Sequence, residues 1–114
     1  MNHIKSDSSI QFQNSPDCVA YEYEFKDEKD INSAVIELSG RYPEIGYAVN
    51  LVCKELVFVI EGSGDVSTIH DKTHLETGDM IRLDSNEQYY FNGNMKLLIS
   101  STPAWYPEQY QNIK

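Results

Sequence analysis

With 114 residues and a mass of 13.1 kDa, the chain is long enough for one packed domain and too short for two. Its 18 acidic residues outnumber 9 basic ones and give a net charge of −9, which disfavours nucleic acid and anionic membrane surfaces as partners. No stretch approaches the ~20 consecutive apolar residues of a membrane span, and the first residues lack the apolar region of a signal peptide. We therefore expect a cytoplasmic protein.

Residues 1–17 are polar around Ile10 and Phe12, and Pro16 closes them. This composition predicts a flexible N-terminal segment that can dock one strand, followed by a barrel domain over residues 18–114.

The first strand of the predicted barrel runs from Cys18 to Phe25, where two sets of side chains alternate. Val19 and Tyr21 begin one face, and Ala20 and Glu22 begin the other. A period of two indicates a half-buried strand. Cys18 itself and Cys53 have no CxxC spacing, so we expect free thiols packed as small apolar residues.

Further strands follow at short spacing, each bounded by Gly, Asn or Asp, with a glycine turn expected at residues 62–65. The block from Leu56 to Ile60 is apolar on both faces, as in a strand that lines an interior and is also covered outside. About eight or nine strands with almost no helix predict an antiparallel sandwich or barrel. The strands after the first are expected at 34–38, 47–52, 56–60, 66–69, 73–76, 80–83, 88–91 and 96–100.

The region from Glu55 to Asp84 resembles the two sequence motifs of cupins. Glu55 and Gly62 have the spacing of the glutamate and the glycine that end the first motif, and Gly78 begins the second. The resemblance implies an all-β, single-domain cupin-type double-stranded β-helix, that is, a jelly-roll barrel with its pocket inside one open mouth. Small cupins often dimerise, so it also implies a homodimer.

Metal-binding cupins usually hold the ion with three histidines and a carboxylate, a donor set that suits Fe, Mn, Ni and Zn. The resemblance puts the carboxylate at Glu55, whereas Tyr89 stands at the histidine position of the second motif. We therefore expect no metal and no other cofactor. The two histidine positions of the first motif fall on Val49 and Leu51, or on Ala48 and Asn50.

His70 and His74 have a spacing that suits two metal ligands on a helix. However, Asp71 and Lys72 between them are typical of the tip of a hairpin, so we expect two solvated histidines.

Two interpretations of Glu55 are open. A carboxylate left in an apolar mouth has a raised pKa and can act as a general base or as a hydrogen-bond acceptor for a ligand. Alternatively, Glu55 has a structural role, in which it is hydrogen-bonded to Tyr89 or paired with Lys54 or Arg82.

An inward-facing Glu55 would place a set of mostly aromatic side chains around the mouth of the barrel. Such a mouth has few polar groups and suits a small neutral or weakly polar ligand; a sugar follows from the resemblance to sugar-related cupins. The predicted ligand-binding residues are Tyr47, Asn50, Glu55, Val57, Tyr89, Phe91 and Trp105.

Three functions follow, in order of preference. The first is a metal-free cupin-like protein that binds a small organic ligand without catalysis. The second is a metal-independent isomerase, epimerase or lyase with Glu55 as base and Tyr89 as acid, a pair that can transfer protons without a metal. The third is a structural homodimer whose barrel is filled by its own side chains.

Overall fold

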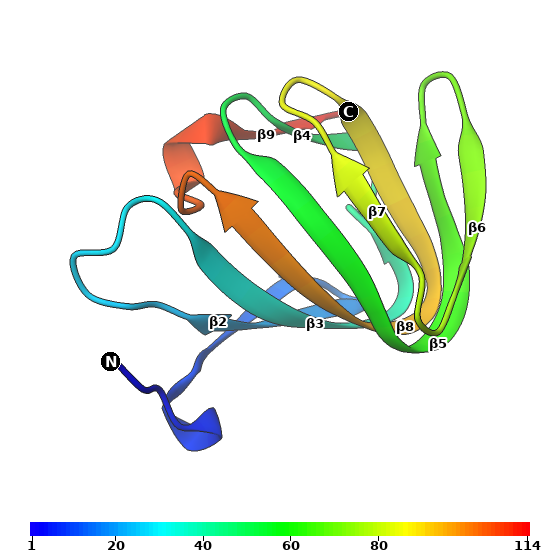
Figure 1. The fold of residues 1–114 in the computed structure, drawn as a ribbon. Helices are drawn as coiled ribbons and strands as arrows, with labels where there is room; N and C mark the ends of the chain where they lie inside the picture. The colour runs from blue at the N-terminus through cyan, green and yellow to red at the C-terminus, as the bar shows by residue number, and fades with distance from the viewer.

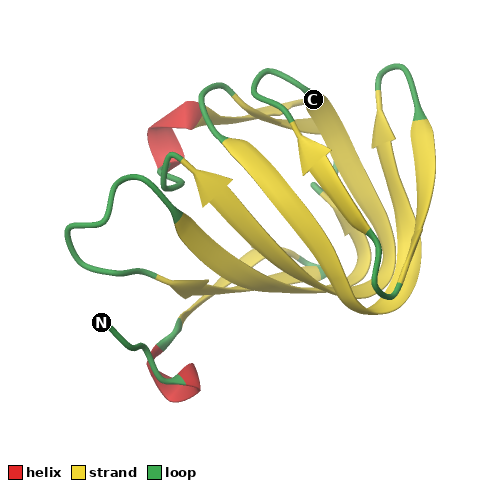
Figure 2. Ribbon diagram, in the orientation of Figure 1, coloured by secondary structure: helices red, strands yellow, loops and turns green.

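A computed structural model describes residues 1–114, and these form almost only strands (Figure 2). Two short 3-10 turns, η1 (Ser6–Ser8) and η2 (Pro107–Gln109), are the exceptions. The structure contains no helix with the length and apolarity that crossing a bilayer requires. The strands are β1 (Ile10–Ser15), β2 (Cys18–Tyr23), β3 (Asn32–Tyr42), β4 (Tyr47–Asn50), β5 (Lys54–Thr68), β6 (Lys72–Glu76), β7 (Met80–Leu83), β8 (Gln88–Thr102) and β9 (Tyr110–Ile113).

The strands form one antiparallel sheet that curls over on itself (Figure 1). Its central strand, β8, pairs with β3 along one side and with β5 along the other. Strands β2 and β1 continue the sheet beyond β3, and β6 and β7 pair with β5. Because β4 and β9 lie across from β2 and β3, the sheet encloses an interior, and the predicted all-β barrel fold is confirmed.

Strands β5 and β8 are each one bent strand, although the sequence predicted two strands in each place and a glycine turn at 62–65. Their ladder continues through Gly64, which lies opposite Gly93. Gly93 has a φ of 150°, and a Cβ atom there would lie 2.5 Å from the Cα atom of Gly64. Only glycine permits this approach of two backbones, so these residues bend the sheet and do not end its strands.

The N-terminal segment contributes a strand at the sheet edge. Residues 10–15, which the sequence placed in a flexible segment, form β1 and pair with β2 from Ile10 opposite Glu22 to Ser15 opposite Cys18. The boundary predicted at residue 17 therefore falls in the turn of the β1–β2 hairpin.

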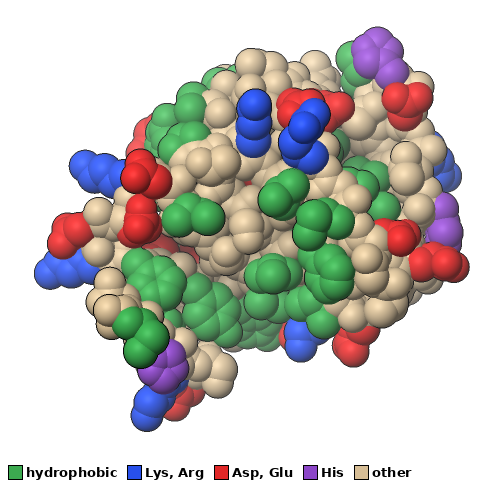
Figure 3. Space-filling model, viewed as in Figure 1, with side chains coloured by type: hydrophobic (Ala, Val, Ile, Leu, Met, Phe, Trp, Pro, Cys, Tyr) green, Lys and Arg blue, Asp and Glu red, His purple; other side chains and the backbone are tan.

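The inward face of β5 begins with Glu55, Val57 and Val59, which are all buried and share one face because of the two-residue period of a strand. The outward side chains Leu56 and Ile60 are 48% and 37% exposed. The prediction that this strand is covered on both faces is therefore wrong. Hydrophobic side chains of β5, β7 and β8 gather on this outer surface (Figure 3).

Both cysteines are buried free thiols, as expected. Cys18 belongs to the core cluster, and burial raises the pKa of its thiol to about 12. Cys53 is completely buried beside the backbone of Pro103, whose oxygen lies 3.3 Å from its sulfur.

Candidate functional site

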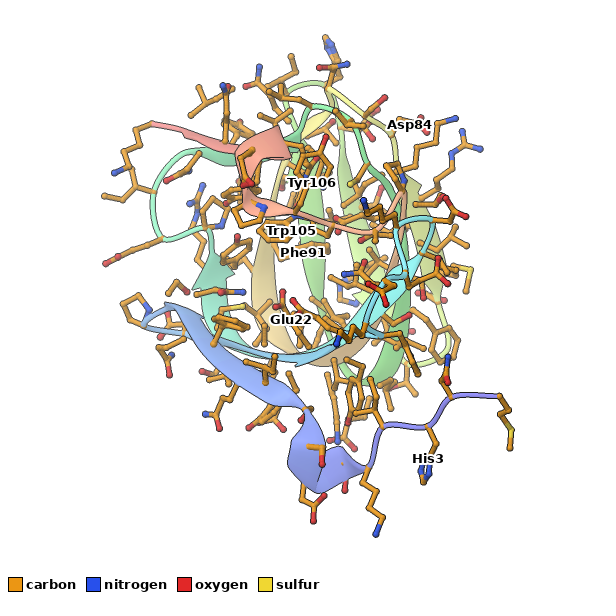
Figure 4. The ribbon with its side chains drawn as sticks, turned by 90° about the vertical axis from the view of Figure 1, so that its left-hand side faces the viewer. His3, Glu22, Asp84, Phe91, Trp105 and Tyr106 are labelled. Carbon is orange, nitrogen blue, oxygen red and sulfur yellow. The ribbon has the colours of Figure 1, made fainter.

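A cavity of about 760 Å³ opens between the β2–β3 side of the barrel and the segment that leads to β9. Figure 4 looks toward this opening, with Glu22 of β2 below Phe91 of β8 and Trp105. The interior is therefore not filled by the chain's own side chains, which the structural-homodimer hypothesis required. Aliphatic residues of β3 and β8, such as Ile36 and Leu97, line it together with the aromatic rings.

Glu55 lines this cavity at the start of β5 and is only 7% exposed. Each of its carboxylate oxygens accepts a hydrogen bond: Asn50 Nδ2 donates to Oε1 at 2.9 Å, and Ser101 Oγ donates to Oε2 at 2.9 Å. Arg82, one of the cations considered as a partner, instead pairs with Asp84 at 2.8 Å. The carboxylate is thus held by neutral donors inside the barrel.

The C-terminal segment determines which way the Asn50 amide points. Asn50 Oδ1 accepts hydrogen bonds from Trp105 Nε1 at 3.1 Å and from Gln109 Nε2 at 2.8 Å. The indole nitrogen can only donate, so Oδ1 must face it and Nδ2 must face Glu55.

Backbone N–H groups determine which way the Gln109 amide points. Its Oε1 accepts from the N–H groups of Val52 at 3.2 Å and Cys53 at 3.1 Å, which leaves Nε2 to donate to Asn50. Successive donors therefore run from the backbone through Gln109 and Asn50 to Glu55, and such chains strengthen each bond by polarisation. The network presents Glu55 with donors only, which favours an ionised carboxylate.

Burial and hydrogen bonding act on Glu55 in opposite directions. Loss of solvent raises the pKa of its carboxyl above the ordinary value, while hydrogen bonding by Ser101, Asn50 and Tyr89 lowers it, and the net shift is upward. A carboxylate of raised pKa at the wall of a cavity has the properties of a general base.

Tyr42, Tyr89 and Tyr110 line the same cavity as Glu55, and Tyr106, which is 40% exposed, is a fourth tyrosine in the lining. Tyr89 is buried and packs edge to face on Phe91, with ring centroids 5.5 Å apart. The Tyr42 hydroxyl donates a hydrogen bond of 2.8 Å to the Tyr110 hydroxyl. Burial raises the pKa of the three less exposed phenols, and the charge of Glu55 raises it further, so each is a neutral proton donor at ordinary pH.

Four of the seven residues predicted to bind a ligand line the cavity: Glu55, Tyr89, Phe91 and Trp105. The other three do not. Asn50 lies behind Glu55 as its donor, Val57 is completely buried in the core, and Tyr47 packs on Tyr90 with ring centroids 5.5 Å apart.

No sequence pattern indicated Ser101, Gln109, Tyr42 or Tyr110 as site residues. Ser101 is buried opposite Glu55 in the β5–β8 ladder, a register that the alternation of one strand does not reveal. Gln109 is only 2% exposed, although it stands in a polar, proline-containing tail. For Tyr42 and Tyr110, the useful signal was the unusually high number of tyrosines, of which the chain has eight.

The residues at this site do not fit the metal that cupins commonly bind. No group of three or more His, Cys, Asp or Glu side chains is placed to hold an ion. Both oxygens of Glu55 already accept hydrogen bonds from Asn50 and Ser101. His70 and His74 lie at the exposed β5–β6 hairpin, as predicted, where His74 Nδ1 is 3.1 Å from Asp65.

Comparison with known proteins finds similarity in structure only. No protein-family model matches the chain, and no curated protein matches it in sequence. The structure of Pac13, a nucleoside dehydratase from Streptomyces, superimposes with a TM-score of 0.89 at 13% sequence identity, covering 100% of this chain and 92% of that one. Variants of that protein solved with uridine give similar scores.

Two further structures extend the comparison. Ectoine synthase from P. lautus has a TM-score of 0.78 at 14% identity and covers 100% of this chain and 91% of its own. Oxalate decarboxylase from Bacillus subtilis has a TM-score of 0.83 at 11% identity and covers 96% of this chain and 31% of its own. These proteins share the cupin-type jelly roll, and the present chain has the same fold.

Proposed function

We propose that this chain is a metal-independent lyase that removes water from a small hydroxylated carbonyl compound related to sugars or nucleosides, with Glu55 as the general base. The observation that carries the proposal is the directed set of donors on Glu55 at the wall of an open cavity. Similarity in fold to a nucleoside dehydratase supports the reaction class.

The chemistry requires one base and one acid on the same cavity. A carbon next to a carbonyl group is acidic enough for a carboxylate to remove its proton. Glu55 takes that proton, a carbon–carbon double bond forms, and the hydroxyl on the next carbon leaves as water after receiving a proton from a phenol. Tyr89, the acid expected from the sequence, is one of four phenols that line the cavity.

A panel of β-hydroxy aldehydes and ketones of the sugar and nucleoside type tests the proposal. We expect mass spectrometry to show the loss of one water and ultraviolet absorbance to show a conjugated carbonyl product. Protein that has been dialysed against EDTA should give both signals. Turnover that disappears with EDTA and returns with a divalent ion would exclude a metal-independent mechanism. The absence of turnover across the panel would leave ligand binding without catalysis as the second candidate, in which the donors on Glu55 serve only to hold its side chain.

The charge of the cavity lining predicts a preference for uncharged ligands. Glu55 shares the lining with three more carboxylates, whereas Lys114 is the only basic residue there. We expect uridine monophosphate to bind about tenfold more weakly than uridine, because ~1.4 kcal/mol of repulsion corresponds to a factor of ten. Calorimetry at low and high salt measures this difference, which salt should reduce. Tighter binding of the phosphate would contradict it. The three carboxylates are Glu22, Glu24 and Glu44.

The homodimer expected from the sequence is also a proposal. The outer surface of β5, β7 and β8 exposes Leu56, Met80 and Leu98, which a second copy would cover. Light scattering on the wild type and on Leu98→Glu gives the mass of each, and we expect a dimer that the charged variant weakens. A wild-type monomer at moderate concentration would exclude it.

A further inference from the structure

Four phenols line the cavity. Tyr106 is 40% exposed, and the three less exposed phenols differ in the hydrogen bonds that their hydroxyls make. Tyr42 is a hydrogen-bond donor to Tyr110, so its proton is engaged within the chain. The Tyr110 oxygen accepts that bond, and its own proton has no acceptor within the chain. Tyr110 therefore keeps a free proton for a group bound in the cavity that its side chain lines.

Tyr89 is in a different position because it is close to the base. Hydrogen bonding from Tyr89 lowers the pKa of Glu55, and the charge of Glu55 raises the pKa of Tyr89, so the two groups are close. When the leaving group is protonated, Glu55 has already taken the C–H proton, so the cost at Tyr89 is that of one phenolate at a residue that is only 5% exposed. Burial is the main reason that the pKa of Tyr89 lies well above its ordinary value, which makes Tyr89 a poor acid.

Tyr110 is the phenol whose oxygen accepts a hydrogen bond from a second phenol, Tyr42, and such a bond stabilises its anion. The hydrogen bond donated by Tyr42 lowers the pKa of Tyr110, whereas burial raises it, with further upward contributions from Cys18 and Glu55. The Tyr110 ring packs on Trp105, with centroids 5.9 Å apart at 52°, which holds it at the cavity wall.

We infer that Tyr110 is the proton donor to the leaving hydroxyl, with Tyr42 as its positioning residue and Tyr89 as a positioning residue for Glu55. The inference rests on the proposed lyase reaction. The C–H bond breaks as its proton goes to Glu55, and its electrons form the double bond. The C–O bond breaks as the hydroxyl takes the Tyr110 proton and leaves as water. Solvent in the open cavity then returns a proton from Glu55 to the Tyr110 phenolate.

Kinetics of three phenylalanine variants test the assignment on the compound that the wild type dehydrates fastest in the panel. We expect Tyr110→Phe to lower kcat by roughly 10²- to 10⁴-fold with little change in KM, the range for loss of a general acid. Tyr42→Phe should lower kcat by about tenfold, because it removes only one hydrogen bond from the developing phenolate. Tyr89→Phe should lower kcat less than Tyr110→Phe does. A larger loss from Tyr89→Phe, or wild-type kcat in Tyr110→Phe, would overturn the assignment.

A titration that needs no turnover separates this inference from the lyase proposal. In protein labelled with ¹³Cζ-tyrosine, NMR follows each phenol with pH, and each variant assigns one resonance. We expect Tyr110 to ionise at a lower pH than Tyr42 and Tyr89, to ionise at higher pH in Tyr42→Phe, and to shift its resonance when uridine is added. A Tyr110 that ionises after Tyr89, or that does not respond to Tyr42→Phe, would overturn the acid assignment alone, whereas a panel without turnover overturns the lyase.

Discussion

Replacement of Glu55 with glutamine is expected to lower turnover strongly and to leave the fold intact. The amide cannot take a proton from carbon, so kcat should fall roughly 10²- to 10⁴-fold, the contribution typical of a general base. The geometry tolerates the change. The substituted amide can accept from Asn50 through its oxygen and donate through its nitrogen to the Ser101 hydroxyl, which can also accept. The loss is therefore expected in kcat, with little change in KM.

The same variant should change how stability depends on pH. The folded pKa of Glu55 lies above its ordinary value of 4.5, mainly because of burial, so the folded state binds more protons than the unfolded state between these two values. Wild-type stability should therefore decrease as pH rises through this window. Because glutamine does not titrate there, Glu55→Gln should show a smaller decrease and equal or greater stability at neutral pH.

Urea unfolding at several pH values, together with turnover assays, checks both expectations. Asn50→Asp is a useful companion variant, since it places a second carboxylate against Glu55 and should destabilise the fold at neutral pH more than at acidic pH. Full activity in Glu55→Gln would exclude Glu55 as the base. A Glu55→Gln protein that unfolds more readily than the wild type at neutral pH would mean that the carboxylate stabilises the barrel.

Among the substitutions considered for this chain, Gly93→Ala is expected to lower the free energy of unfolding the most. Its Cβ would lie 2.5 Å from the Gly64 Cα and 2.7 Å from the Ser63 carbonyl oxygen, and both are backbone atoms of a paired strand that cannot move aside. We expect a destabilisation of about 4 kcal/mol or more, at the upper end for a single substitution. Many molecules should then be unfolded, since domains of this size have stabilities of roughly 5–15 kcal/mol.

Gly78→Ala is the matched control for this substitution. Gly78 also has a positive φ, of 93°, but a Cβ there meets no atom within 4 Å. Its replacement should cost only the conformational strain, about 1–2 kcal/mol. Thermal and urea unfolding of both variants separates the steric contribution from the strain. Equal losses in the two variants would mean that the close approach of β5 and β8 does not limit the fold.

Local sequence patterns predicted both ends of β5 as strands, but they predicted a turn at the place where this one strand bends. The two-residue period places Glu55, Val57 and Val59 on one face, and in the structure all three are buried. The glycines at 62–65 predict a turn, because glycine is common both in turns and where a strand bends sharply. In the structure Gly62 has a φ of 90° within a continuous strand. Only the pairing of Gly64 with Gly93 distinguishes the bend from a turn, and that pairing is a property of the whole sheet.

Strand β2 shows why alternation does not identify the side that is buried. One face carries Val19, Tyr21 and Tyr23 and the other Cys18, Ala20 and Glu22, and the period of two predicts a strand without saying which face is buried. In the structure Cys18 and Ala20 are buried, and Glu22 on the same face lines the cavity. The neighbouring strands decide which face turns inward, and in this case they bring a carboxylate with it.

The amino-acid sequence was sufficient to predict the strand-rich single domain, the cupin-like spacing around Glu55 and Gly62, and the common face of Glu55, Val57 and Val59, because these depend on neighbouring residues and on the two-residue period of strands. Which groups surround that carboxylate became visible only in the folded chain. Asn50 and Gln109 are 59 positions apart, and Tyr42 and Tyr110 are 68 apart. Their contacts arise from the closure of the sheet and the return of the C-terminal segment, which no local pattern encodes.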